Sequence, residues 1–245
     1  MKTYIVKSGD ILGKIATEYK TTVAILMDLN GISNPNIISI GQQLVVPSPE
    51  RDELNARNIN EKVRTYVNFL EGKMLKRILT NEQRANINTI FQTCLQLRVT
   101  DLRSVAYILA TTQWETNRTF KPIEEIGKGR GKTYGIPHPK TNKVYYGRGY
   151  CQLTWYDNYE RFTRILNSRG YNVDLINKPE QALDPHIAAL ILVIGMKEGK
   201  YTGRDLDDYF NDSREDWYNA RKIVNGTDKA VVIKDIAVET HYIIK

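Results

Sequence analysis

The sequence has little of what metal or redox chemistry needs. Its two cysteines, Cys94 and Cys151, stand in apolar surroundings and form no C-x-x-C pair, which predicts buried free thiols, as in a reducing compartment. Two cysteines and three scattered histidines do not make a zinc site, so we expect no metal and no cofactor. No apolar run approaches the roughly 20 residues that span a bilayer, which predicts no membrane insertion.

The N-terminus also lacks the apolar core of a signal peptide. Lys2, Lys7 and Asp10 make the first ten residues too polar for such a segment. We therefore expect synthesis in the cytoplasm without a signal peptide. If the substrate lies outside, another component has to release the protein to it.

The balance of charge is basic, with a formal net charge of +7. A basic surface attracts polyanions such as nucleic acid, anionic lipid or the acidic polymers of a cell wall. The basic residues are spread along the chain and no nucleic-acid motif accompanies them, so we predict no nucleic-acid partner. A length of 245 residues suits one large domain, or a small one and a medium one.

The first 47 residues form a self-contained pattern of strand, helix, helix and strand. A short apolar strand over 4–6 is followed by Gly9 and by Asp10, which is placed to cap a helix. Apolar residues then recur at helical spacing over 11–19 and again over 23–29. An Asn30-Gly31 stop signal and a closing strand over 44–46, ended by Pro47, complete the pattern.

This module resembles a LysM domain. The resemblance rests on the segments Tyr4–Leu12, Ile15-Ala16, Leu29-Asn30 and Ile40–Pro47. It implies a module that binds glycans containing N-acetylglucosamine, either peptidoglycan or chitin. The family's shallow groove, carried over to this sequence, is formed by Gly9, Asp10, Ile11, Leu12, Gly31 and Ile32.

A boundary follows the module. Two prolines, Pro47 and Pro49, and the charged run over 50–53 predict a stiff, solvated spacer. We divide the chain into a glycan-binding module over 1–47, a linker over 48–58 and a catalytic domain over 59–245. Tethering a weak binder to an enzyme raises the local concentration of substrate.

The large domain is predicted to be mainly helical. Apolar stripes at helix spacing occupy 63–70 and 87–94, and Thr80 with Gln83 fits a capping box. A third helix begins near Thr100 and leads to Trp114 and Glu115. Burial beside a Trp disfavours the charged form of a carboxyl group, and a protonated Glu is what a glycosidase needs to protonate a leaving oxygen.

The segment that follows this helix has the composition of a sugar-binding site. Residues 121–149 are rich in Gly, Lys and Tyr, and include Glu124 and Glu125. Over 145–155 aromatic residues alternate with Gln, Thr and Arg. Rings stack on sugar faces and amides bind hydroxyl groups, so this pattern favours contact with a glycan.

These motifs resemble the chitinase-like catalytic domain of glycoside hydrolase family 19, most of all its bacteriophage endolysin branch. The resemblance covers roughly 100–240 and is carried by Glu115-Thr116, Pro122–Glu125, Tyr146–Trp155, Asn158-Tyr159 and Ile223–Gly226. It implies a mainly α, lysozyme-like fold and an inverting mechanism. The whole chain would then be a small α+β module, with a βααβ order, joined to a larger mainly α domain.

The resemblance also implies roles for single residues. Glu115 matches the general acid, and Glu125 matches the second carboxylate better than Glu124 does. Thr154 matches the residue that holds the attacking water. Polar positions that contact the glycan are Tyr146, Gln152, Asn158 and Asn225. The family carries a His before the acid, where this chain has Trp114, which leaves the orientation of Glu115 open.

Several functional interpretations stay open at this stage. We expect an endolysin-like peptidoglycan hydrolase that cuts the β-1,4 glycan strand, acts on the wall after release and is a monomer. A lytic transglycosylase that uses Glu115 alone, a chitinase and a non-catalytic wall-binding protein are the alternatives. A cysteine peptidase that pairs Cys151 with His138 or His186 is disfavoured by the apolar context of the thiol.

Overall fold

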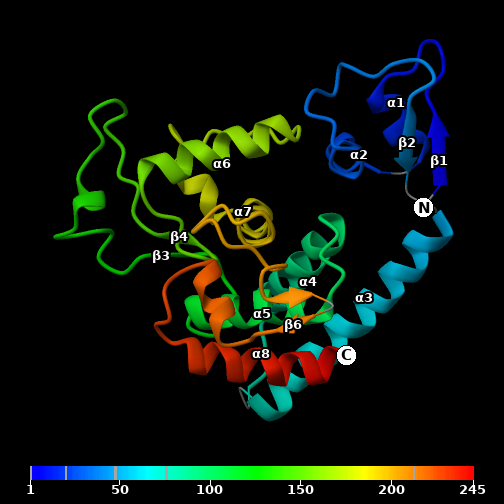
Figure 1. Cartoon of the computed structure of the whole chain (residues 1–245). Helices are drawn as coiled ribbons and strands as arrows, with labels where there is room; N and C mark the ends of the chain where they lie inside the picture. Colours follow the sequence, from blue (N-terminus) through cyan, green and yellow to red (C-terminus); the bar gives the residue numbers. More distant parts are fainter. Residues whose placement is uncertain (1, 20, 47–48, 75–76, 212) are drawn as a thin grey trace.

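The N-terminal module consists of a two-stranded sheet and two helices. The computed structural model describes residues 2–19, 21–46, 49–74, 77–211 and 213–245. Strand β1 (Lys2–Ile5) pairs antiparallel with β2 (Gln43–Val46), and α1 (Leu12–Glu18) and α2 (Val23–Asn30) come between them in the chain. This is the predicted order of strand, helix, helix and strand (Figure 1).

The module has a small apolar core of its own. Its buried members are Val6, Leu12, Ile15, Ala16, Leu26, Met27, Leu44 and Val46. The side chain of Asn30 joins α2 to β2, because it donates to the carbonyl of Val45 and accepts from the amide of the same residue. The core and this clamp hold the two ends of the module together.

The predicted capping role of Asp10 is wrong. The residue that precedes α1 is Ile11, and its side chain makes no capping hydrogen bond. Gly9 takes a positive φ of 86°, and the carboxylate of Asp10 accepts hydrogen bonds from the hydroxyl of Tyr4 and the amide of Lys7, both at 2.7 Å. Asp10 therefore closes the turn after β1 and does not cap the helix.

The predicted linker is helical over most of its length. Helix α3 (Pro49–Phe69) begins inside it and runs on into the large domain, where a π-helical turn (Leu70–Met74) follows. Proline suits the first position of a helix, where its missing N–H has no partner to lose, and the residues after it are mostly good helix formers. The predicted stiff spacer is thus helical from Pro49 onward, while Pro47 and Ser48 lie outside the described residues.

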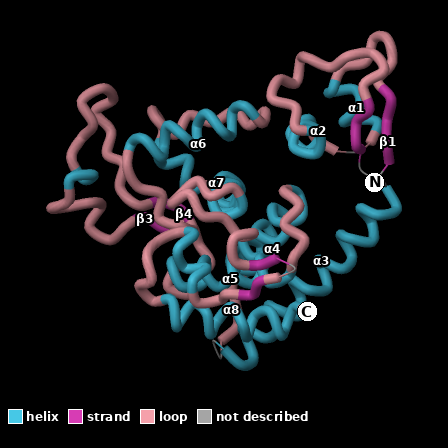
Figure 2. The backbone as a smooth tube through the Cα atoms, in the orientation of Figure 1, coloured by secondary structure: helices cyan, strands magenta, loops and turns pink. Residues whose placement is uncertain are grey.

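The large domain is mainly α, as predicted (Figure 2). Its further helices are α4 (Asn81–Gln96), α5 (Leu102–Glu115), α6 (Tyr156–Ser168), α7 (Pro185–Lys197) and α8 (Ala230–Ile244). Its strands form two short antiparallel pairs, β3 (Ile123–Glu124) with β4 (Arg148–Gly149), and β5 (Phe210–Asn211) with β6 (Arg214–Glu215). Short 3-10 turns occupy Thr133–Gly135, Pro179–Leu183 and Asn219–Ile223.

Two helices form the centre of the large domain. Helix α7 buries every residue from Ala188 to Met196, and α5 buries every residue from Ser104 to Gln113. A helix that is apolar on all sides has to be covered on all sides, and α8 packs along α5 (Figure 1). Among the described residues, no helix is both long and apolar enough to cross a membrane.

The start of α4 confirms one local prediction. Thr80 accepts a hydrogen bond from the amide of Gln83, and the side chain of Gln83 accepts one from the amide of Thr80. The predicted capping box therefore forms, and such a cap stabilises a helix by about 1 kcal/mol.

Candidate functional site

Glu115 ends the most deeply buried part of α5. It is the last residue of that helix, and its side chain is 19% exposed. Trp114, which stands where the resembled family has a His, is half-buried and packs against the main apolar core. The Trp therefore fixes the end of α5 by packing, and Glu115 is left at the surface of the core.

A buried arginine stands against Glu115. Nη1 of Arg221 lies 2.9 Å from Oε1 of Glu115, and the arginine side chain is only 4% exposed. Nη1 lacks hydrogen-bond geometry to any described group, so the two side chains form an ion pair without an aligned hydrogen bond. The guanidinium thus supplies the opposite charge for a carboxylate that is partly buried at the end of a helix.

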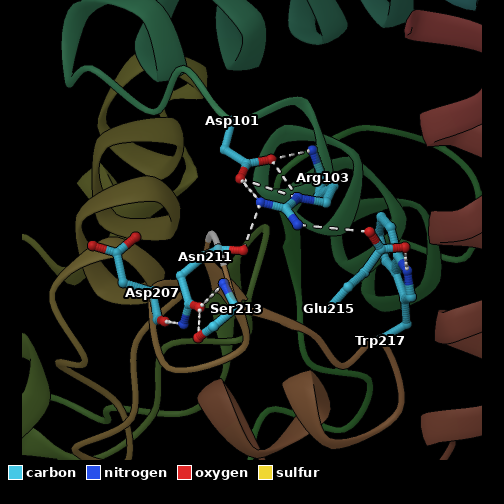
Figure 3. Close-up of polar contacts among 7 residues, drawn as sticks. All are labelled: Asp101, Arg103, Asp207, Asn211, Ser213, Glu215 and Trp217. Carbon is cyan, nitrogen blue, oxygen red and sulfur yellow. Dashed lines mark hydrogen bonds and ion pairs between the residues drawn. The ribbon is translucent and has the colours of Figure 1, made fainter.

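The segment that carries Arg221 is fastened to the other end of α5. Arg103, in the first turn of that helix, donates to the carbonyl of Asn211 at 3.2 Å and lies 3.6 Å from the carboxylate of Glu215 (Figure 3). Asp101 holds the same guanidinium from the opposite side. The β5–β6 hairpin is thereby fixed to the start of α5, and the chain that leaves it carries Arg221 back to Glu115.

Glu124 is held by cations. It sits on β3 opposite Arg148 on β4. Its carboxylate accepts from the hydroxyl of Tyr146 at 2.5 Å and from Lys128 at 3.0 Å, and it lies 3.7 Å from Nε of Arg148. The hydroxyl of Tyr146, followed by Lys128, lowers the pKa of Glu124 below its ordinary value of 4.5. Glu124 is therefore a charged structural group and a weak base.

Glu125 has neutral partners instead. Glu125 is the first residue after β3, and its contacts differ from those of Glu124. Its Oε1 accepts from the hydroxyl of Tyr134 at 2.9 Å and its Oε2 from the amide of Gly147 at 3.1 Å. Among the described residues Glu125 forms no ion pair, so its carboxylate is not neutralised by cations as that of Glu124 is.

Much of the aromatic string over 145–155 is core. Arg148 is buried, with its guanidinium 3.6 Å from the ring centre of Tyr146. Tyr159 is fully buried and donates to the carbonyl of Tyr146 at 2.8 Å. Tyr146 is itself buried and bound to Glu124, which argues against its predicted contact with a glycan. Only Trp155, at 49% exposed, keeps a large aromatic surface open.

The polar residues of this string are partly occupied within the fold. The amide nitrogen of Gln152 donates to the carbonyl of Ile123 at 3.1 Å, so it ties the string to β3. Thr154 donates its hydroxyl to the carbonyl of Gln152 at 2.7 Å, and Asn158 donates to the carbonyl of Thr154 at 2.8 Å. The side-chain oxygen of Asn158 also accepts from Arg161 at 3.1 Å, so the side-chain oxygens of Gln152 and Thr154 are better placed to accept from a water or a sugar hydroxyl.

Cys151 links the two halves of the site and excludes thiol chemistry there. Burial raises the pKa of its thiol to about 12, and the charge of Glu115 acts in the same direction, so the two side chains lie within electrostatic reach. Its sulfur contacts the hydroxyl of Tyr201 at 2.9 Å. His138 stacks on Tyr156 instead. A protonated thiol without a His partner in these contacts speaks against a cysteine peptidase.

Asn225 lies apart from this buried network. It is exposed, and its side-chain oxygen accepts from the amide of Gly226 at 2.8 Å. It follows Arg221 by one helical turn, and its amide bonds the carbonyl of Arg221 at 3.0 Å. The ion pair with Glu115 thus brings the segment of Asn225 toward the end of α5.

The predicted groove residues of the N-terminal module differ in exposure. Gly9, Gly31 and Ile11 are exposed, Ile11 to 58%, and Ile32 is half-buried. Leu12 is buried in the core of the module, so only its backbone is available to a ligand. The described module therefore offers Ile11 as the main apolar surface among the six predicted residues.

Two partners of the site have no signal in the sequence. Arg221 pairs with Glu115 and Tyr134 with Glu125, yet neither residue stands in a motif that we singled out. Each contact depends on how distant segments pack. The only available hint for Arg221 is that the buried Glu115 has to be matched by a cation.

Comparison with known proteins gives a specific match only for part of the chain. Residues 4–47 match the family model described as LysM domain. The endolysin of Bacillus phage PZA is 59% identical over 44 residues, and the N-acetylmuramoyl-L-alanine amidase XlyA of Bacillus subtilis strain 168 is 46% identical over 52 residues. These matches cover 18% and 21% of this chain, and 17% and 18% of the two relatives.

A solved structure is similar to a larger part of the chain, at a low level. It is chitinase C from Streptomyces griseus HUT6037, which is 18% identical with a TM-score of 0.39 over 77% of this chain and 83% of that one. A likeness of this size does not establish a shared fold or a shared activity. The features of the large domain therefore rest on its own geometry.

Proposed function

We propose that the chain is a peptidoglycan hydrolase of the endolysin type, which cleaves the β-1,4 glycan strand and holds to the wall through its LysM module. In this proposal the large domain is a glycoside hydrolase with an inverting acid–base mechanism. Glu115 protonates the leaving oxygen, and Glu125 activates a water held by Thr154.

The observation that carries the proposal is the placement of Glu115. A carboxyl group at the end of a buried helix, against a buried arginine, is costly for the fold and is therefore best explained by chemistry. The acid of a glycosidase has to stand where it can deliver a proton to the leaving oxygen, and Glu115 lies at the edge of the core with its side chain 19% exposed. Arg221 would fix the carboxyl and stabilise the carboxylate that remains after proton transfer.

The choice of Glu125 as the second carboxylate rests on its partners. Glu124 is held by Lys128, Arg148 and Tyr146, which make it a weak base. Glu125 accepts only from a tyrosine hydroxyl and a backbone amide. In an inverting enzyme the two carboxyl groups stand roughly 6.5–9.5 Å apart with a water between them.

The LysM match supports a wall glycan as the partner. Modules of this family bind glycans that contain N-acetylglucosamine. Two proteins that match a short part of the chain are an endolysin and an N-acetylmuramoyl-L-alanine amidase. Tethering would raise the local concentration of glycan at the large domain. Release to the wall and a monomeric state remain predictions.

The test is the clearing of a peptidoglycan suspension by a Glu115→Gln variant. We expect clearing to be abolished while the variant still sediments with walls as the parent does. Glu180→Gln, at an exposed site, is the matched control and should clear normally. Because Glu115→Gln leaves Arg221 without its partner, circular dichroism has to show that the variant is folded. Normal clearing by a folded Glu115→Gln protein would refute the mechanism.

The second carboxylate and the alternatives have their own readouts. Glu125→Gln should reduce the rate of clearing far more than Glu124→Gln does, and the reverse result would assign the base to Glu124. Analysis of the released ends separates the reaction classes. A hydrolase leaves a reducing sugar, whereas a transglycosylase leaves an anhydro sugar. A chitinase would cleave chitin oligomers and leave peptidoglycan intact.

A further inference from the structure

The net charge of the chain is concentrated in one segment. Basic residues are spread along the sequence, but residues 126–156 contain no Asp or Glu. They contain six basic residues: Lys128, Arg130, Lys132, Lys140, Lys143 and Arg148. This segment therefore has a formal charge of +6, and the whole chain has a net charge of +7.

Most of these charges lie on a loop that faces solvent. We call residues 126–143 the basic loop; it leaves β3 and extends away from the helices (Figure 1). Lys128 is engaged by Glu124. Arg130, Lys132, Lys140 and Lys143 are exposed, and none of them forms an ion pair with a residue that the structure describes. Four cations are thus available to an external anion.

The backbone of the loop turns tightly between successive cations. Gly127, Gly129 and Gly131 alternate with basic residues and all have positive φ, between 75° and 85°. The amide of Arg130 donates to the carbonyl of Gly127, and the amide of Lys132 donates to the carbonyl of Gly129. Glycine tolerates this conformation without strain, so the backbone can make successive tight turns between Lys128, Arg130 and Lys132.

Two anchors fix the basic loop beside the proposed catalytic carboxylate. Tyr134 donates to Glu125 at 2.9 Å, and its ring meets Trp155 edge to face at 5.2 Å. His138 stacks on Tyr156 with ring centres 3.9 Å apart. The loop is therefore attached to the start of α6 through Trp155 and Tyr156, and to Glu125 through Tyr134.

We propose that the basic loop binds the carboxylates of the peptide stems of peptidoglycan, and so makes the large domain select a charged glycan over uncharged chitin. This inference rests on the proposed function, because it assigns the substrate class of the same site. The glycan strand carries an anionic peptide on alternate sugars, next to the bonds that would be cut. Chitin carries no such group, so the four exposed cations of a loop that is attached to Glu125 through Tyr134 have no partner on it.

The test neutralises the four free cations together. The loop variant carries Arg130→Gln, Lys132→Gln, Lys140→Gln and Lys143→Gln. The matched control carries Arg64→Gln, Lys178→Gln, Lys234→Gln and Lys245→Gln, which lowers the net charge by the same amount outside the loop. Both are compared with the parent on purified sacculi and on glycol chitin, a soluble neutral polymer.

We expect the loop variant to lose about tenfold in kcat/KM on sacculi at low salt, because four exposed charge pairs contribute weakly one by one but together reach that size. The loss should shrink at high salt, which screens exposed charges. Hydrolysis of glycol chitin, where present, should not change. A control variant that loses as much as the loop variant would overturn the proposal, since net charge alone would then explain the effect.

Chemical treatment of the wall shows whether the basic loop binds peptide carboxylates or phosphate polymers. On sacculi stripped of phosphate polymers by acid, the difference between parent and loop variant should persist. On sacculi whose carboxylates are amidated, it should disappear. If the difference exists only on walls that carry phosphate polymers, those polymers are the partner and the assignment to peptide carboxylates is wrong.

Binding measurements keep this test independent of catalysis. In a Glu115→Gln background, cosedimentation with stripped sacculi should be weaker with the loop substitutions than with the control substitutions. If the parent proves not to cleave glycan, the proposed function fails while this binding difference can still stand. If binding is equal for both sets and the parent cleaves sacculi, only the role of the basic loop fails.

Discussion

The ion pair between Glu115 and Arg221 allows a quantitative test of the site's construction. The perturbation is a double-mutant cycle with Glu115→Gln, Arg221→Gln and both together. Either single change leaves a charge near the core without its partner, and breaking a buried pair typically costs about 3–5 kcal/mol. The guanidinium is 4% exposed and cannot lose its proton, so the cost of Glu115→Gln should lie at the upper end of this range.

The size of the coupling follows from the geometry. Opposite charges with centres about 4 Å apart attract by about 4 kcal/mol at an effective dielectric constant of about 20. The carboxylate is 19% exposed, so solvent screens part of this attraction. Since partial screening roughly halves the gross value, we expect a coupling of about 2 kcal/mol between the two substitutions.

The assay is thermal unfolding followed by circular dichroism at neutral pH. For a domain of this size each kcal/mol shifts Tm by about 2–4 °C, so each single variant should unfold about 6–20 °C below the parent. The Tm of the double variant should lie clearly above the value expected if the two losses simply added. The exposed pair Arg164 and Glu160 is the control cycle and should couple by less than about 0.5 kcal/mol. Additive losses for Glu115 and Arg221 would refute the pairing.

Three further predictions concern single groups. Glu124→Gln should lower Tm at pH 7. The pKa of Glu124 in the folded protein is below 4.5, so the charged carboxylate stabilises the fold above that pH and this contribution is lost as the pH falls. The Tm values of parent and variant should therefore converge in acid. Convergence at pH 7 instead would contradict the ion pairs. Cys151→Ala should leave clearing of peptidoglycan intact, because burial raises the pKa of the thiol to about 12 and keeps it protonated; loss of clearing in a folded variant would restore the peptidase interpretation. Thr80→Ala should cost about 1 kcal/mol in urea unfolding through loss of the cap of α4, without changing the rate of clearing.

Local patterns in the sequence predicted the elements well where one helix or turn decides the outcome. The capping box of Thr80 and Gln83 forms, and α5 ends at Glu115 as its apolar stripe indicated. These features depend on residues within one or two turns of each other. The predicted cap of α1 was wrong because Asp10 had other partners within reach, and its carboxylate binds Tyr4 and Lys7 instead.

The partners of the candidate catalytic residues were decided by the tertiary structure. Glu115 and Arg221 are joined only because the β5–β6 hairpin is fixed to α5, and the burial of Tyr146 follows from the stacking of Arg148 on its ring. The sequence alone determined the order of the helices, the glycan-binding pattern of the module and the identity of Glu115 as a candidate acid. Packing decided which neighbouring carboxylate is neutralised by cations, because charge pairing depends on distance in space and the chain sets only distance along itself.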